Sequence, residues 1–76
     1  MYATPNPASD KLTVHVGGSA GQRGTITLTD MAGRVLRHTQ VAGTETEVNL
    51  TGIPAGLYLL QYMGVEHTAV IRVQKL

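Results

Sequence analysis

The side chains best suited to metal binding or catalysis are few in this 76-residue chain and lie far apart. A zinc site draws on His, Cys and acidic ligands at short, characteristic spacings. The chain has no cysteine, and its three histidines, His15, His38 and His67, show no such spacing. We interpret the histidines as exposed strand residues, and we predict neither a metal nor any other cofactor.

A nucleophilic serine needs a base within hydrogen-bond reach and a third group that orients the base. The two serines, Ser9 and Ser19, lie in turn-like stretches without a nucleophile-elbow motif. Two of the carboxylates suit turns and two alternate along one strand, which is not the pattern of a catalytic pair. The carboxylates are Asp10, Asp30, Glu45, Glu47 and Glu66. The chain is therefore predicted not to be an enzyme.

The sequence also shows no pattern typical of binding to nucleic acid or of insertion into a lipid bilayer. The glycine-rich stretch 17–24 has neither the Lys-Ser/Thr ending nor the strand-to-helix context of a phosphate-binding loop, so it predicts a flexible hairpin connection. The net charge is only +1 and the six basic residues are scattered, so no nucleic-acid partner is expected. No apolar run approaches the ~20 residues of a transmembrane segment.

The elements that must position any functional side chain are short strands. Apolar and polar residues alternate, and turn signals recur about every 8–12 residues, which is typical of a sandwich or barrel. The expected strands are 11–16, 25–29, 34–41, 46–50, 57–63 and 67–76. Their inward residues are Leu12, Val14, Val16, Ile26, Leu28, Val48, Leu50, Ile71 and Val73. We predict one all-β domain, a small immunoglobulin-like antiparallel β-sandwich of about seven strands, with a small barrel as the alternative.

The stretch 50–62, LTGIPAGLYLLQY, combines a turn with a strongly apolar strand. In immunoglobulin-like sandwiches, a tyrosine after such a turn packs its ring into the core and bonds to upstream backbone. We expect Tyr58 to have this role, with Leu50 and Ile53 buried beneath the turn and Gly56 in an unusual backbone conformation. Three leucines fall on both faces of the strand, which predicts a central strand covered on both sides. They are Leu57, Leu59 and Leu60.

Two other stretches predict tight turns. The stretch 4–10, TPNPASD, is rich in proline, and we expect the side chains of Asn6 and Asp10 to bond to nearby backbone amides. The stretch 30–33, DMAG, predicts a type I turn that a left-handed glycine closes.

The chain has four motifs, here called the opening, turn, corner and terminal motifs. Their residues and their order along the sequence resemble the C-terminal sorting domain, type A, of cargo proteins of the type IX (Por) secretion system of Bacteroidetes. The resemblance covers essentially the whole chain. The matching residues are Pro5, Asn6, Pro7 and Asp10 in the opening motif, Asp30, Gly33 and Arg34 in the turn motif, Leu50, Pro54, Gly56 and Tyr58 in the corner motif, and Val73 and Lys75 in the terminal motif. Family members often finish on a basic or polar residue, whereas this chain ends on Leu76.

The resemblance implies a label without catalysis of its own. Residues 1–76 would be a single C-terminal sorting domain excised from a larger exported protein, with Met1 as an added start residue. Outer-membrane translocon proteins would recognise it in the periplasm. A sortase-like peptidase would cut it off upstream of the opening motif, and the cargo would be attached to the cell surface or released.

The last strand offers a physical route to recognition. A final strand at a sheet edge leaves N–H and C=O groups unpaired, so a translocon component could add a strand there. The same edge could support dimers of the domain. A second hypothesis is an immunoglobulin-like accessory module that binds polysaccharide or a surface ligand, although the chain lacks the tryptophans common in sugar-binding platforms.

Overall fold

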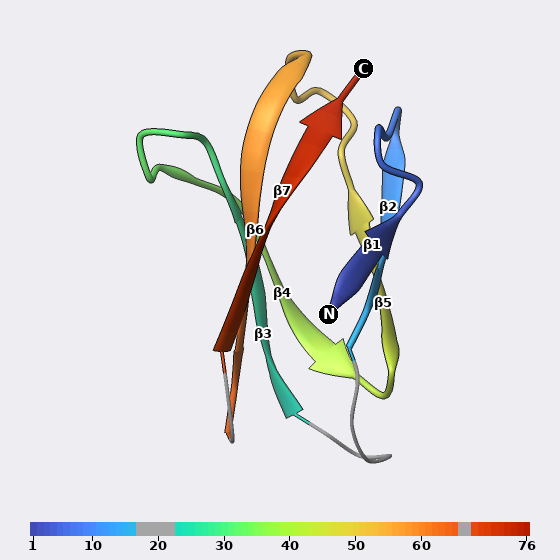
Figure 1. Ribbon diagram of the computed structural model, residues 1–76, viewed down its shortest axis with the longest axis vertical. Helices are drawn as coiled ribbons and strands as arrows, with labels where there is room; N and C mark the ends of the chain where they lie inside the picture. The colour runs from blue at the N-terminus through green and yellow to red at the C-terminus, as the bar shows by residue number, and fades with distance from the viewer. Residues whose placement is uncertain (17–22, 66–67) are drawn as a thin grey trace.

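The alternating apolar residues form seven strands, and these make two antiparallel sheets packed face to face (Figure 1). The computed structural model describes residues 1–16, 23–65 and 68–76. The strands are β1 (Tyr2–Thr4), β2 (Lys11–His15), β3 (Arg23–Thr29), β4 (Val35–Ala42), β5 (Glu45–Asn49), β6 (Gly56–Gly64) and β7 (Thr68–Lys75). One sheet has the order β1-β2-β5 and the other β4-β3-β6-β7. The predicted antiparallel sandwich is confirmed.

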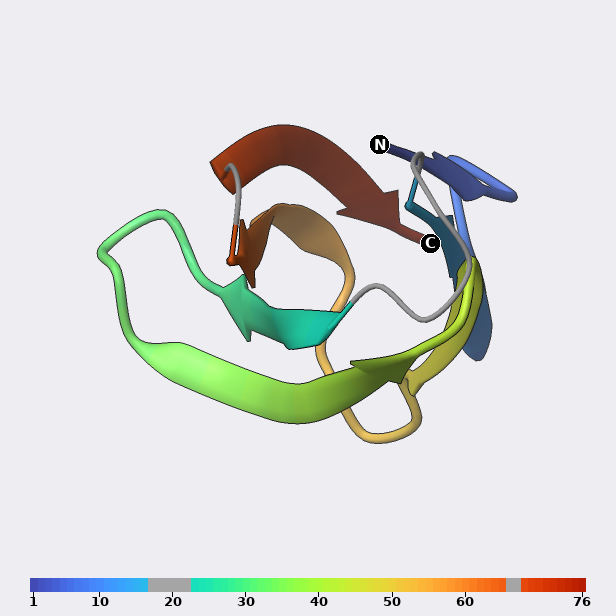
Figure 2. The ribbon, with the colours of Figure 1, turned by 90° about the horizontal axis from the view of Figure 1, so that it is seen from below.

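The two sheets are connected at both lateral edges of the sandwich (Figure 2). On one side the chain passes directly from β4 into β5, so it changes sheets at this hairpin. On the other side an isolated parallel bridge joins Ala8, between β1 and β2, to Lys75 at the end of β7. The strands still form two separate sheets and not the closed barrel that was the alternative.

The sequence pattern predicted six of the seven strands within a residue or two of their observed bounds. The seventh, β1, was not predicted, because three residues next to a proline-rich stretch are too short to show an alternation. The expected loop at 17–22, together with Ser19, Glu66 and His67, lies outside the described residues.

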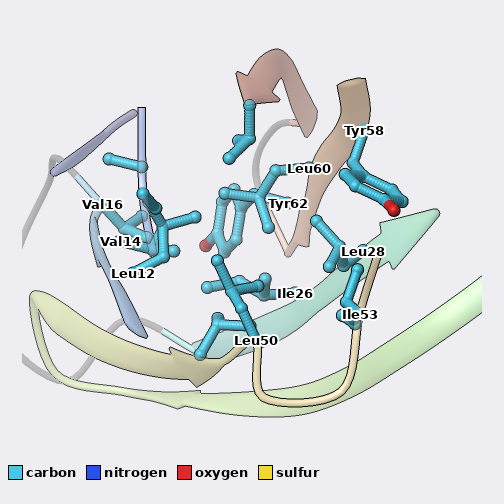
Figure 3. Close-up of a cluster of buried hydrophobic side chains, with 14 of the residues drawn as sticks. Leu12, Val14, Val16, Ile26, Leu28, Leu50, Ile53, Tyr58, Leu60 and Tyr62 are labelled. Carbon is cyan, nitrogen blue, oxygen red and sulfur yellow. The ribbon is translucent and has the colours of Figure 1, made fainter. Parts of the chain in front are cut away.

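Residues from both sheets meet in one apolar core (Figure 3). Every inward position predicted for the strands is buried except Ile71, which is partly buried and packs against the core. From β6, Tyr58, Leu60 and Tyr62 point into this core (Figure 3). The core has no phenylalanine or tryptophan, so these two tyrosines supply its largest side chains.

The prediction that β6 is covered on both faces is wrong. β6 lies between β3 and β7, but its residues alternate between buried and solvent-facing. Leu57 and Met63 are about half exposed, at 49% and 52%. A sandwich has only two layers, so each sheet keeps one face toward solvent. A central position within the sheet protects the edges of β6, not its outer face.

The ring of Tyr62 fits against a pair of glycines. Gly24 in β3 and Gly64 in β6 are register partners. A Cβ atom on Gly24 would lie 2.6 Å from the Tyr62 ring, and one on Gly64 would overlap the tyrosine hydroxyl. The Tyr62 hydroxyl donates a hydrogen bond to the carbonyl of Arg23 at 3.3 Å. The two glycines therefore provide the space in which this fully buried tyrosine packs.

Candidate recognition surface

All four sequence motifs lie toward one end of the sandwich, the upper end in Figure 1. Successive strands run in opposite directions, so the β1–β2, β3–β4 and β5–β6 connections and the C-terminus of β7 all come to the same end. We call this the signature end and define it by residues 5–10, 30–34, 50–58 and 73–76. The sandwich topology thus gathers thirteen residues that span most of the chain.

The opening motif contacts the last strand and not its own neighbourhood. The Asn6 amide nitrogen Nδ2 donates to the carbonyl of Arg72 at 3.1 Å, and Asn6 Oδ1 accepts from the amide of Gln74 at 3.0 Å. The expected bonds from Asn6 to nearby amides are therefore wrong. Asp10 contributes its backbone carbonyl, which accepts from the amide of Leu50 at 2.7 Å. These contacts tie the opening motif to both the terminal and the corner motif.

The turn motif confirms the predicted tight turn. Asp30 Oδ1 accepts hydrogen bonds from the amides of Ala32 and Arg34 at 3.0 and 2.9 Å. Gly33 has a φ of 91°, a left-handed conformation that glycine adopts without strain. Asp30 Oδ2 lies 3.2 Å from Arg34 Nε. The bond from the Arg34 amide is the largest of the effects that hold the pKa of Asp30 below its ordinary value of 3.8.

The corner motif has the predicted tyrosine arrangement. The Tyr58 hydroxyl donates to the carbonyl of Pro54, four residues upstream. Leu50 and Ile53 are buried beneath the turn, and the amide of Ile53 donates to the carbonyl of Leu50 at 3.1 Å. Gly56 has a φ of 155°, as expected for an unusual backbone position. The corner therefore depends on side chains that lie in the core.

The terminal motif is paired along β6 with the corner motif. Val73 is opposite Tyr58 and Lys75 is opposite Gly56. Val73 is buried, whereas Lys75 is half-buried and its Nζ donates to the carbonyl of Leu76 at 3.0 Å. The prediction of an unpaired last edge is wrong for this half of β7, because the opening segment already occupies it.

The thirteen motif residues are buried, partly buried or exposed. Leu50, Tyr58 and Val73 are buried, so their role is to build the fold. Asp30, Gly56 and Lys75 are partly buried, and Gly33 is exposed but has no side chain. The other six have exposed side chains at the signature end, where they are available to a partner. They are Pro5, Asn6, Pro7, Asp10, Arg34 and Pro54.

Sequence reasoning missed Arg37, which joins the two sheets. Its guanidinium donates to the carbonyls of Leu36 at 2.8 Å, Asn49 at 3.1 Å and Thr51 at 2.8 Å. The last two acceptors flank Leu50, the first residue of the corner motif. Arg37 lies opposite the buried Leu28 and shares its row of β4 with the buried Val41, so a basic residue at a partly buried strand position was the signal for this role.

The outer face of the three-stranded sheet carries a second polar cluster. The Tyr2 and His15 rings stack with centroids 4.3 Å apart. His15 Nε2 lies 3.1 Å from Thr4 Oγ1, and Nδ1 lies 3.4 Å from Glu45 Oε1. His15 is therefore half-buried and bonded, and not the fully exposed residue expected. His38 lies exposed on β4, and the described residues contain no cluster of three or more potential metal ligands.

Comparison with protein families gives one match over almost the full chain. Residues 2–75 match the model of the secretion system C-terminal sorting domain. No curated protein matches. No helix in the described ranges is long and apolar enough to cross a membrane.

A solved structure has the same fold. It is PorZ, described as an essential bacterial surface component of the type IX secretion system of Porphyromonas gingivalis. The two share 27% sequence identity with a TM-score of 0.79. The alignment covers 99% of this chain but only 11% of PorZ, so the similarity concerns one small part of that protein.

Proposed function

Since the chain belongs to the secretion system C-terminal sorting domain family, we propose that its signature end is the surface by which type IX translocon proteins recognise an exported cargo. Sorting domains of this family mark proteins that are exported to the cell surface or secreted. The domain itself acts as a label and carries out no reaction. Its partners are outer-membrane translocon proteins and a sortase-like peptidase.

The single observation that supports this proposal is the convergence of the four motifs at one end (Figure 1). Buried members such as Tyr58 shape this end, while exposed members such as Arg34 and Pro54 present side chains to solvent. One partner can therefore contact several motifs at once, although they are far apart in the sequence.

The later steps follow the same proposal. The cargo passes through the periplasm and crosses the outer membrane under the direction of this domain. The peptidase then cuts upstream of the opening motif, and the cargo is attached to the surface or released. In this scheme residues 1–76 are covalently part of a larger protein until the cut.

Export of a reporter tests the proposal. Residues 1–76 are fused to a periplasmic reporter in a type IX-competent bacterium, and reporter at the cell surface and in the medium is measured. We expect export of the unaltered fusion. We expect about a tenfold loss with Arg34→Glu, a size typical of a central interface residue. The Arg34–Asp30 pair is exposed on the arginine side, so its loss alone should cost little stability.

Arg23→Glu is the matched control, because it makes the same charge reversal on an exposed residue at the start of β3, away from the signature end. Thermal unfolding of both variants checks that they fold. Periplasmic retention of the unaltered fusion would overturn the sorting role. Equal export of the two folded variants would overturn the assignment of Arg34 to the recognition surface.

A further inference from the structure

Residues 6–8, in the opening motif between β1 and β2, lie along the outer edge of β7. β7 is the last strand of its sheet, with β6 on one side. On its other side, the amide of Ala8 donates to the carbonyl of Gln74 at 2.8 Å, and the amide of Leu76 donates to the carbonyl of Ala8 at 2.8 Å. With the two bonds from Asn6, four hydrogen bonds hold this segment to residues 72–76.

The contact is anchored but short. Ala8 is fully buried in the core cluster, whereas Asn6 and the two flanking prolines are exposed. Only one residue pair, Ala8 and Lys75, forms a β-bridge. The neighbouring ladder between β6 and β7 pairs eight residues on each strand. Local opening occurs most easily where few contacts must break, so this segment should open well before the ladders do.

We propose that residues 6–8 are a strap that covers the C-terminal half of the β7 edge and that must detach before another strand can pair there. The reason is that the carbonyls of Arg72 and Gln74 and the amides of Gln74 and Leu76 are already bonded to the strap. Strand addition uses these same outward groups of an edge strand. The strap and an added strand therefore exclude each other.

Detachment would change the start of the domain as well as its end. The strap lies between β1 and β2, so its release frees the backbone that follows β1. The ladders of β2 with β1 and β5 do not include strap residues and can stay formed. A partner that pairs with β7 would in this way free the connection between β1 and β2 while β1 itself stays paired. This last step rests on the proposed function; the strap itself does not.

Amide hydrogen exchange in residues 1–76 tests the strap. In Asn6→Ala, which removes two of the four bonds, we expect the amides of Ala8, Gln74 and Leu76 to exchange about tenfold faster. The amides of Ile26 and Leu60, in the central strands β3 and β6, should exchange as in the unaltered chain.

Two further variants sharpen the test. Asn6→Asp keeps an acceptor for the Gln74 amide but loses the donor to Arg72, so its effect on Gln74 should be smaller. Ser9→Ala changes an exposed neighbour whose side chain makes no hydrogen bond within the described residues, and it should change none of these rates.

Either of two results would overturn the proposal that residues 6–8 are a detachable strap. One is unchanged exchange at Ala8, Gln74 and Leu76 in Asn6→Ala. The other is an equal acceleration at Ile26 and Leu60, which would mean that the segment opens only when the whole domain unfolds. The measurement needs no translocon, so its failure would leave the sorting role intact, and failure of reporter export would leave the strap intact.

Discussion

Asp30 is a single side chain that both fixes a turn and links stability to pH. Its carboxylate accepts two backbone amides and lies beside Arg34, and the bond from the Arg34 amide contributes most to lowering its pKa below 3.8. A carboxyl group whose pKa is lowered in the folded state stabilises that state when the pH is above the pKa of the group in the unfolded chain. This contribution is lost as the pH falls below about 3.8 through the folded value.

We therefore expect Asp30→Asn to weaken the acid sensitivity of the domain. Asparagine keeps an oxygen that can accept the two amides but does not titrate. Denaturant unfolding at about pH 7 and about pH 3 should show a smaller loss of stability in the variant than in the unaltered chain. The same loss in both proteins would contradict a titrating role for Asp30.

Thr46 has the one buried side-chain oxygen or nitrogen that lacks a hydrogen-bond partner among the described residues. It lies on β5 opposite Val14, on the inward row that also contains Val48. A buried hydroxyl without a partner costs about 1–3 kcal/mol. Thr46→Val keeps the side-chain shape, so the free energy of unfolding should rise by about 1 kcal/mol in denaturant titrations. A decrease would mean that the hydroxyl is satisfied in solution.

At the scale of elements, Arg37 shows why a strand pattern does not reveal how two sheets are joined. The inward rows of the strands were predictable, because alternation of Leu, Ile, Val and Thr follows the period of the strand itself. Two acceptors of Arg37, the carbonyls of Asn49 and Thr51, lie beyond β4 in the chain, and the Arg72 carbonyl that accepts from Asn6 Nδ2 lies 66 residues away. No local pattern encodes such contacts, since they exist only once the sheets have packed.

Replacement of Arg37 by lysine keeps the positive charge but should still destabilise the sandwich. The lysine ammonium cannot reproduce the planar donors that reach Asn49 and Thr51 together. We expect the free energy of unfolding to fall by about 1–3 kcal/mol, since hydrogen bonds from charged donors are involved. Arg72→Lys, at an exposed position on β7, is the control and should change it by less than about 0.5 kcal/mol. Equal values for the two would contradict the role of Arg37.

At the scale of the whole molecule, the order of the motifs was readable from the sequence but the contacts between them were not. Turn residues such as Asp30 and Gly33 predicted where the chain reverses, and the number of reversals places alternate turns at one end. The pairing of the opening segment with β7 was not predictable, because it depends on which strands become sheet edges. The two-layer architecture also decided that Leu57 and Met63 face solvent despite their apolar character.

Substitutions of Tyr58 distinguish loss of export that is caused by unfolding from loss of export that is caused by a changed recognition surface. Its ring is buried and its hydroxyl bonds to the Pro54 carbonyl. Truncation of a large buried ring to alanine costs about 3–5 kcal/mol. A 76-residue domain has only about 4–11 kcal/mol in total. We expect Tyr58→Ala to be largely unfolded at growth temperature and to lose export for that reason.

The conservative variant completes this test. Tyr58→Phe keeps the ring and loses one hydrogen bond, so it should be about 1 kcal/mol less stable, remain folded and still be exported. Circular dichroism melting and the reporter assay measure both properties on the same fusions. If Tyr58→Ala stayed folded and still lost export, the corner would contact the translocon directly, and its buried tyrosine would have to become accessible during recognition.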